Sequence, residues 1–373
     1  MRRREFCVGG ITLAAGCAGP SESPRVVAGP PDDDLTPTGG PYGIEPTVPR
    51  GPYAGESAGL RRAVQATVVL AGQRRREVSA IDVATGRQQT LAATPAPVWQ
   101  LSPPDRHGAV AIVTHAAGER RYAVRLIANG RDHVVLDGIG DPLWDEPLGP
   151  PALSDDGRWL LAVTQPVADA RYQPLFVGHL RCWSTGNGRE RALRAEPLLA
   201  LGERPAWSHA GHEIVYAAPG PQGRASPTPL APSMQPDPQI RRFDLVTGRD
   251  EVLTPGHHPV LSNDGRSMLL RPPGPHGWVW WDIARASARP VPRIAGLRVP
   301  LALVESRYLI YTGAPSPGAP AGTTVNNSPL VGPKPLLSLK VADLASGAHE
   351  TLLDGIDPRR VLAARGGAQR SVR

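Results

Sequence analysis

The sequence predicts an all-β fold, a six-bladed β-propeller of four-stranded antiparallel blades. Three observations predict it: a hairpin pattern that recurs at a constant interval, a strand–turn–strand pattern that alternates with it, and a C-terminal strand that fits the one incomplete repeat. Gly (41) and Pro (43) together make up roughly a fifth of the 373 residues. This composition suits many short strands joined by turns.

The first pattern is an apolar run, a Ser, a tight turn of Asp, Asn and Gly, and a second apolar run, which together indicate a β-hairpin. Its serines recur at intervals of 54 residues, as Ser154, Ser208 and Ser262. The clear copies cover residues 151–163, 205–217 and 259–271, and weaker copies cover residues 98–113 and 299–313. Short strands that recur at such an interval favour a propeller.

The second pattern is an apolar strand, a turn after an Asp, and another strand. Gly86, Gly248 and Gly347 lie where this turn needs a positive φ, which other residues resist. The clear copies cover residues 78–91, 240–254 and 339–353, and the weaker ones residues 123–136, 180–193 and 278–291. Each copy supplies the second half of a four-stranded repeat.

Pairing the two halves predicts five complete blades and one incomplete blade. The complete blades cover residues 96–136, 148–193, 203–254, 257–291 and 297–353, while residues 64–91 supply three strands of another. Residues 361–364 form a further predicted strand, which would complete the first blade and leave no open sheet edge. A frayed C-terminal tail is the alternative, and a ring of five or seven blades remains open.

The start of the chain is a predicted export signal. Three arginines precede a ten-residue apolar stretch, which is too short to span a bilayer, so residues 1–16 are expected to be a signal peptide. Residues 13–17, Leu-Ala-Ala-Gly-Cys, resemble the bacterial lipobox, which implies that Cys17 carries acyl chains. Residues 3–6 resemble the twin-arginine motif without its usual flanking residues. The twin-arginine and general secretory routes both remain open, as does an ordinary signal with an incidental Cys.

A tether and a single folded domain are expected to follow. Residues 17–59 are rich in Pro, Gly, Ser and Asp and cannot bury enough apolar surface to fold. Residues 60–373 are expected to form the propeller. Cys182 is the one Cys in this part, so we expect a buried thiol and no disulfide.

The repeats resemble those of the TolB-like propeller family. Residues 205–208 (Pro-Ala-Trp-Ser) and 154–157 (Ser-Asp-Asp-Gly) match the first part of the family repeat, and residues 244–248 (Asp-Leu-Val-Thr-Gly) match the second. The resemblance covers roughly residues 64–365 and implies the propeller fold. The family includes a Pal-binding translocation protein, propellers that gate peptidases, and oligogalacturonate lyases, so the fold alone does not select a function.

Several function classes find little support in the residues. The net charge is +7, but the arginines are scattered, which argues against nucleic-acid binding. The sequence shows no helical α/β domain after the propeller that would carry a serine-hydrolase site, and no catalytic residue is predicted. His209 and His212 lie in a hairpin turn and His257 and His258 in a blade connection, on opposite faces, so neither a metal nor another cofactor is expected.

Long loops offer the best clue to a binding face. Residues 165–178, 219–239 and 313–337 are predicted to emerge on the face of the blade connections, although drift would also lengthen surface loops. The connection 137–150 adds an exposed aromatic residue among acids: Asp141, Trp144, Asp145 and Glu146. These four residues are the candidate partner-binding site, able to hold a cation or a basic partner, with solvated loop charges as the alternative.

We therefore expect a monomeric, membrane-anchored lipoprotein of the cell envelope or periplasm that acts as a protein-binding or envelope scaffold module. The partner is expected to be a protein or another envelope component. A metal-dependent, lyase-like propeller enzyme acting on polysaccharide is one alternative. A propeller that gates a peptidase encoded on another chain is the other.

Overall fold

The computed structural model describes residues 59–72, 76–115, 122–139, 150–167, 177–193, 197–200, 203–208, 211–220, 238–274, 277–291, 294, 296–314, 337–356 and 360–367. All of them belong to the second of two compact units, Pro46–Arg373. They form strands and one short 3₁₀ helix, η1 (Leu60–Ala63). No helix in this described part has the length and apolarity needed to cross a membrane. The predicted signal peptide and tether, with Cys17, lie outside the described residues.

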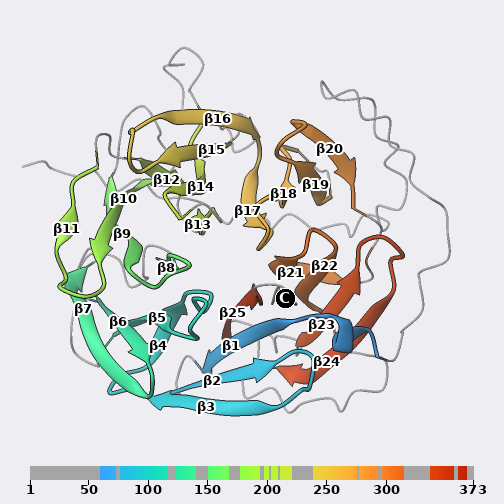
Figure 1. Cartoon of the computed structure of the whole chain (residues 1–373), viewed down its shortest axis with the longest axis horizontal. Helices are drawn as coiled ribbons and strands as arrows, with labels where there is room; N and C mark the ends of the chain where they lie inside the picture. The colour runs from blue at the N-terminus through green and yellow to red at the C-terminus, as the bar shows by residue number, and fades with distance from the viewer. Residues whose placement is uncertain are drawn as a thin grey trace, which may run out of the picture. The chain divides into compact units, whose positions relative to one another are not determined.

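The strands form six antiparallel sheets arranged in a ring, which confirms the six-bladed propeller (Figure 1). Blade 1 contains β25 (Arg360–Gly366), β1 (Ala66–Gly72), β2 (Glu77–Asp82) and β3 (Gln88–Ala93). Blade 2 contains β4 (Val98–Leu101), β5 (Val110–Thr114), β6 (Tyr122–Ala128) and β7 (Arg131–Ile139). Blade 3 contains β8 (Ala152–Leu153), β9 (Trp159–Val167), β10 (Val177–Ser184), β11 (Glu190–Arg191) and β12 (Leu198–Ala200).

Each of the remaining three blades consists of four strands that are consecutive in the sequence. Blade 4 contains β13 (Ala206–Trp207), β14 (Glu213–Ala218), β15 (Gln239–Asp244) and β16 (Asp250–Pro255). Blade 5 contains β17 (His257–Leu261), β18 (Ser267–Arg271), β19 (Val279–Asp282) and β20 (Ser287–Pro290). Blade 6 contains β21 (Leu297–Val304), β22 (Tyr308–Gly313), β23 (Leu337–Asp343) and β24 (His349–Ile356). All six predicted blade positions are therefore confirmed.

Blade 3 differs from the prediction at its outer edge. Two short strands, β11 and β12, both pair with β10 in place of one continuous outer strand. β11 pairs with Cys182 and Trp183, whereas β12 pairs with Val177, Gly178 and His179 at the other end of β10. β10 is eight residues long and its two ends are thus covered separately.

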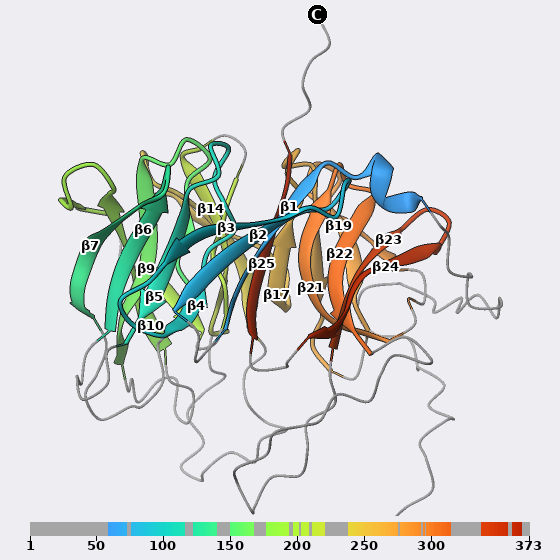
Figure 2. The same cartoon turned by 90° about the horizontal axis from the view of Figure 1, so that it is seen from below.

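The C-terminal strand closes the ring, as predicted. β25 pairs antiparallel with β1 from Ala66↔Gly366 to Gly72↔Arg360. In Figure 1 it lies innermost in blade 1, and Figure 2 shows the strands of the same blade from the side. The side chains of Leu362, Ala363 and Ala364 are buried. Just beyond the strand, the Asn263 side chain of blade 5 donates to the Gly367 carbonyl at 2.8 Å. Because β25 covers the inner edge of β1, blade 1 has four strands, as blade 2 does.

The recurring serines and aspartates are turn residues. The Ser154 hydroxyl donates to Asp156 at 2.7 Å and accepts the Trp159 N–H at 3.0 Å. In the second pattern, the Asp244 carboxylate accepts the N–H groups of Val246 and Thr247 at 2.7 and 3.0 Å. These hydrogen bonds stabilise the ionised carboxylate and lower the pKa of Asp244. The side chains that recur most regularly thus serve the hairpins.

The apolar core lies between neighbouring blades. One cluster combines Leu161, Leu180 and Cys182 of blade 3 with Ile214 and Phe243 of blade 4. Successive side chains of a strand point to opposite faces of its sheet, and β5 is buried along its whole length: Ala111 packs in a cluster with residues of blade 3, and Ile112 in a cluster with residues of blade 1. Burial raises the pKa of the Cys182 thiol to about 12, which makes it an unreactive core residue, as the sequence predicts.

Candidate functional site

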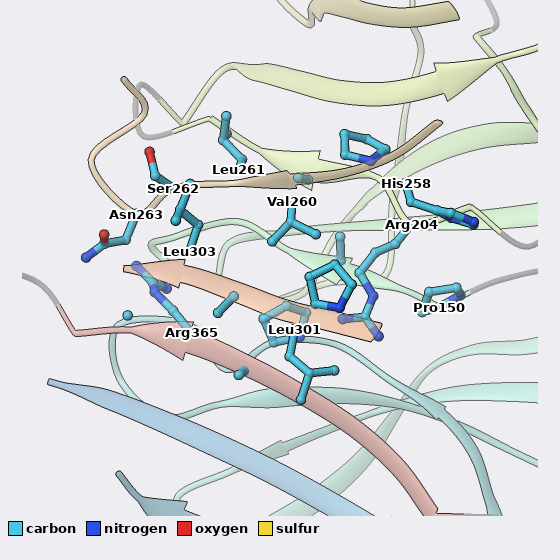
Figure 3. A pocket seen from close by; sticks show the side chains of 18 of the residues that line it. Pro150, Arg204, His258, Val260, Leu261, Ser262, Asn263, Leu301, Leu303 and Arg365 are labelled. Carbon is cyan, nitrogen blue, oxygen red and sulfur yellow. The ribbon is translucent and has the colours of Figure 1, made fainter. Parts of the chain in front are cut away.

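A cavity of about 450 Å³ lies where the inner strands of the six blades meet (Figure 3). Its lining includes residues of β25, β4, β8, β13, β17 and β21 and of the segments next to them. We call it the central cavity. Much of its wall is apolar, with Val260, Leu261, Leu301 and Leu303 among its lining residues. A cavity of this size falls within the range of ordinary ligand pockets.

The charged residues of the lining are predominantly basic. Among the described residues, four arginines line the cavity, Arg204, Arg271, Arg298 and Arg365, against one carboxylate, Asp155. Arg365 is paired with Asp155 at 2.6 Å and also donates to the Pro104 carbonyl at 3.3 Å. The ion pair connects the closing strand β25 to blade 3 and the hydrogen bond connects it to blade 2, so Arg365 stabilises the closed ring. Three arginines remain without a carboxylate in the lining.

Arg204 is the most enclosed of these three arginines. Its side chain is only partly accessible to solvent and makes no hydrogen bond or ion pair with any residue that the structure describes. Desolvation by the surrounding protein lowers its pKa to about 10. The guanidinium therefore remains charged at neutral pH. In Figure 3 the Arg204 side chain extends into the cavity toward the strand that carries Leu301.

Arg271 and Arg298 are exposed residues of the lining. Arg271 ends β18 and pairs with His257 of β17, whereas Arg298 is the second residue of β21 and lies at the irregularity between Leu297 and Val299. Among the described residues, neither has an acidic partner. The cavity therefore combines apolar walls with three guanidinium groups free to bind an anion.

Repeat equivalence explains how these residues come together. Pro150, Arg204 and His258 lie four residues before Ser154, Ser208 and Ser262 respectively. All three line the cavity, since equivalent positions of successive blades face the same axis (Figure 3). Aligning the repeats at the 54-residue interval would therefore have placed Arg204 at a position equivalent to Pro150 and His258. This relation is not visible when each repeat is considered separately.

The structure also groups titratable residues beside the cavity. Glu203, just before blade 4, lies against His257 and His258 at the start of blade 5. His212 belongs to a separate group with Glu213 and Asp244, while His209 lies outside the described residues. His212 thus falls in another group than His257 and His258, and sequence reasoning missed Glu203.

The predicted partner-binding residues Asp141, Trp144, Asp145 and Glu146 lie outside the described residues. So does most of each of the long loops 165–178, 219–239 and 313–337. Their role in binding stays a prediction.

Comparison with known proteins supports the fold. No protein-family model matches the chain, and no curated protein matches it. Among solved structures, the chain is similar to TolB from Acinetobacter baumannii, at 14% identity and a TM-score of 0.53, over 81% of this chain and 67% of that one. Two similarities have lower TM-scores. A putative TolB from Agrobacterium tumefaciens is 13% identical over 82% of this chain and 99% of that one, with a TM-score of 0.43. Hydrazine synthase from Kuenenia stuttgartiensis is 12% identical over 56% of this chain and 59% of that one, with a TM-score of 0.38. The first similarity agrees with the propeller, and at these identities it shows the fold alone.

Proposed function

We propose that this protein is an extracytoplasmic binding module, anchored through a lipid on Cys17, whose central cavity binds an acidic segment of a protein partner. The observation that carries the proposal is the excess of three arginines in a half-apolar cavity at the centre of the ring. The lipobox-like residues 13–17 support the location.

Desolvation is the reason to expect an acidic ligand. Arg204 has lost part of its hydration without gaining a carboxylate. Such a cation gains most from an incoming carboxylate, which can accept two hydrogen bonds from one guanidinium. Arg298 and Arg271 extend the positive field to more exposed parts of the lining, which favours capture of an anion from solution.

The apolar part of the wall is the reason to expect a polypeptide. The lining includes Leu301, Leu303 and Trp278, together with several prolines. A peptide segment brings both carboxylates and apolar side chains, and it would bury the latter against this surface. A polysaccharide, rich in hydroxyl groups, would leave many of them without hydrogen-bond partners there.

Binding of fluorescein-labelled hexaglutamate tests the charge selectivity of the cavity. We expect wild-type protein to bind it with an affinity that falls as salt rises. Arg204→Gln removes a hydrogen bond between charged groups, about 1.5–3 kcal/mol, so the Kd should rise by about tenfold or more. Fluorescence anisotropy at two salt concentrations gives both results.

Arg87→Gln is the matched control, because Arg87 is exposed in the turn between β2 and β3 and does not line the cavity. Its affinity for hexaglutamate should equal that of wild type. Equal binding of hexalysine, or an unchanged Kd for Arg204→Gln, would contradict the proposal. Tighter binding of an oligogalacturonate than of hexaglutamate would instead favour the polysaccharide enzyme.

Replacing Cys17 tests the lipid anchor. We expect Cys17→Ser to move the protein from the membrane fraction to the soluble fraction of the producing cell, because the acyl chains would have no attachment site. Cys7→Ser, in the same leader, should leave the protein with the membranes. Fractionation followed by immunoblotting measures both, and membrane retention of Cys17→Ser would refute the anchor.

A further inference from the structure

Glu203, His257 and His258 form a compact group of metal-ligand residues beside the central cavity. The Nδ1 atom of His258 lies 2.9 Å from Oε1 of Glu203, and Nδ1 of His257 lies 3.8 Å from the same oxygen. One ligand atom from each residue falls within 4.8 Å of the others. We call these three residues the Glu–His–His group.

The carboxylate of this group is buried. The Glu203 side chain is 6% exposed, against 24% for His257 and 47% for His258. Within the described residues, the Glu203 carboxylate has no Arg or Lys partner; it is held by the two imidazoles and by the His258 N–H, which donates at 2.7 Å. A buried, ionised carboxylate needs positive charge nearby to offset its desolvation, and a bound divalent cation would supply it.

The backbone is distorted so that two consecutive histidines can face the same carboxylate. In a regular strand, neighbouring side chains point to opposite faces. Here the register between β17 and β18 shifts after His257, and His258 has a φ of 54°. The two imidazole rings consequently lie 4.6 Å apart. Positive φ is uncommon for residues other than Gly, so this conformation is held by its surroundings.

Gly256 makes this distortion possible. Its φ is 145°, and a Cβ at this position would lie 2.9 Å from the Leu270 side chain and 3.0 Å from the Arg271 carbonyl oxygen. The chain therefore enters β17 in close contact with the neighbouring strand β18, and His257 and His258 are the next two residues in the sequence.

The distances suit a tetrahedral ion. Zinc binds imidazole nitrogen and carboxylate oxygen at about 2.0–2.2 Å, which places two ligand atoms of a tetrahedron roughly 3.4 Å apart. The observed 2.9 and 3.8 Å fall on either side of this value. Two imidazoles with one carboxylate form a ligand set typical of zinc and of other divalent transition metals.

We propose that the Glu–His–His group binds a divalent transition-metal ion of the zinc class at the wall of the central cavity. Three protein ligands leave one coordination position for water or for an anionic group of a ligand. His258 lines the cavity, so that position would be reached from it.

Zinc titration of the full chain, purified without a polyhistidine tag, tests this site. We expect one Zn²⁺ per chain in competition with a chromophoric chelator, and a melting temperature that rises with zinc. His258→Gln and Glu203→Gln should each weaken binding at least tenfold and abolish the rise. His257→Gln gives the same test at a more exposed side chain, should Glu203→Gln fail to fold.

Two other histidines provide the controls. His133→Gln alters an exposed residue of β7 far along the chain from the group, and it should bind zinc as wild type does. His212→Gln removes a ligand of the second group and should also leave tight binding intact. Absence of zinc binding by wild type, loss of binding in His212→Gln, or equal binding by all variants would overturn the proposal.

Discussion

A chain that ends at residue 359, and therefore lacks β25, is expected not to fold into a stable propeller. The deletion removes the whole ladder from Ala66↔Gly366 to Gly72↔Arg360 and the buried side chains of Leu362, Ala363 and Ala364. It also exposes the inner edge of β1. The loss should be comparable to the whole stability of a typical domain, about 5–15 kcal/mol, and the open edge should promote aggregation.

The control is a chain that ends at residue 368, which keeps β25 and the Asn263 hydrogen bond to Gly367. Thermal unfolding followed by circular dichroism should give this chain the melting temperature of the full protein. Adding a peptide of residues 360–373 to the shorter chain should restore part of the cooperative transition. A shorter chain as stable as the full protein would show that β25 does not close the ring.

Phe243→Ala is expected to lower the free energy of unfolding by about 3–5 kcal/mol, the usual loss when a fully buried aromatic side chain is replaced by Ala. Phe243 lies on β15 and packs in the cluster shared by blades 3 and 4, with Leu180 and Ile214 among its members. Because this cluster spans two blades, the space left by the missing Phe243 ring weakens the packing between blades 3 and 4 as well as the packing within blade 4. Urea unfolding measures the loss.

Val252→Ala provides the comparison within the same blade. Val252 lies on β16 and is 46% exposed, so its truncation should change the free energy of unfolding by no more than about 0.5 kcal/mol. Equal losses for the two variants would contradict a core located between the blades.

The fold was predictable because its signal is repeated. Ser154, Ser208 and Ser262 are spaced at one interval, and each of them marks a hairpin; the side chains of Ser154 and Ser262 also donate to the Asp two residues later in the turn. Because the same local pattern recurs along the chain, it can be recognised even where individual repeats are weak. The prediction that β25 would complete blade 1 followed from counting strands and from the cost of an open edge.

The central cavity was harder to predict because its wall is assembled from six separate segments. Arg298 and Arg365 come from β21 and β25, and nothing in either strand alone marks it as facing a cavity. The split outer edge of blade 3 was also missed, since β11 pairs through only two residues and leaves no periodic pattern.

Two residues of the Glu–His–His group could have been paired from the sequence, but only after aligning the repeats. Glu203 lies five residues before Ser208, and His257 five residues before Ser262. Equivalent positions of adjacent blades are neighbours in a propeller, so a Glu and a His at this offset are predicted to meet. The positive φ of His258, which brings the second imidazole to Glu203, depends on packing around Gly256 and has no such signal.

The most direct test of the proposed function is to locate bound hexaglutamate on the wild-type protein. Hexaglutamate carrying a photoreactive group is cross-linked to the protein, and the attachment sites are mapped by mass spectrometry. We expect attachment to the inner strands β13, β17 and β21, whose residues line the cavity with Arg204 and Arg298. Attachment confined to outer strands such as β7, β16 or β20 would show that the acidic segment binds elsewhere on the ring.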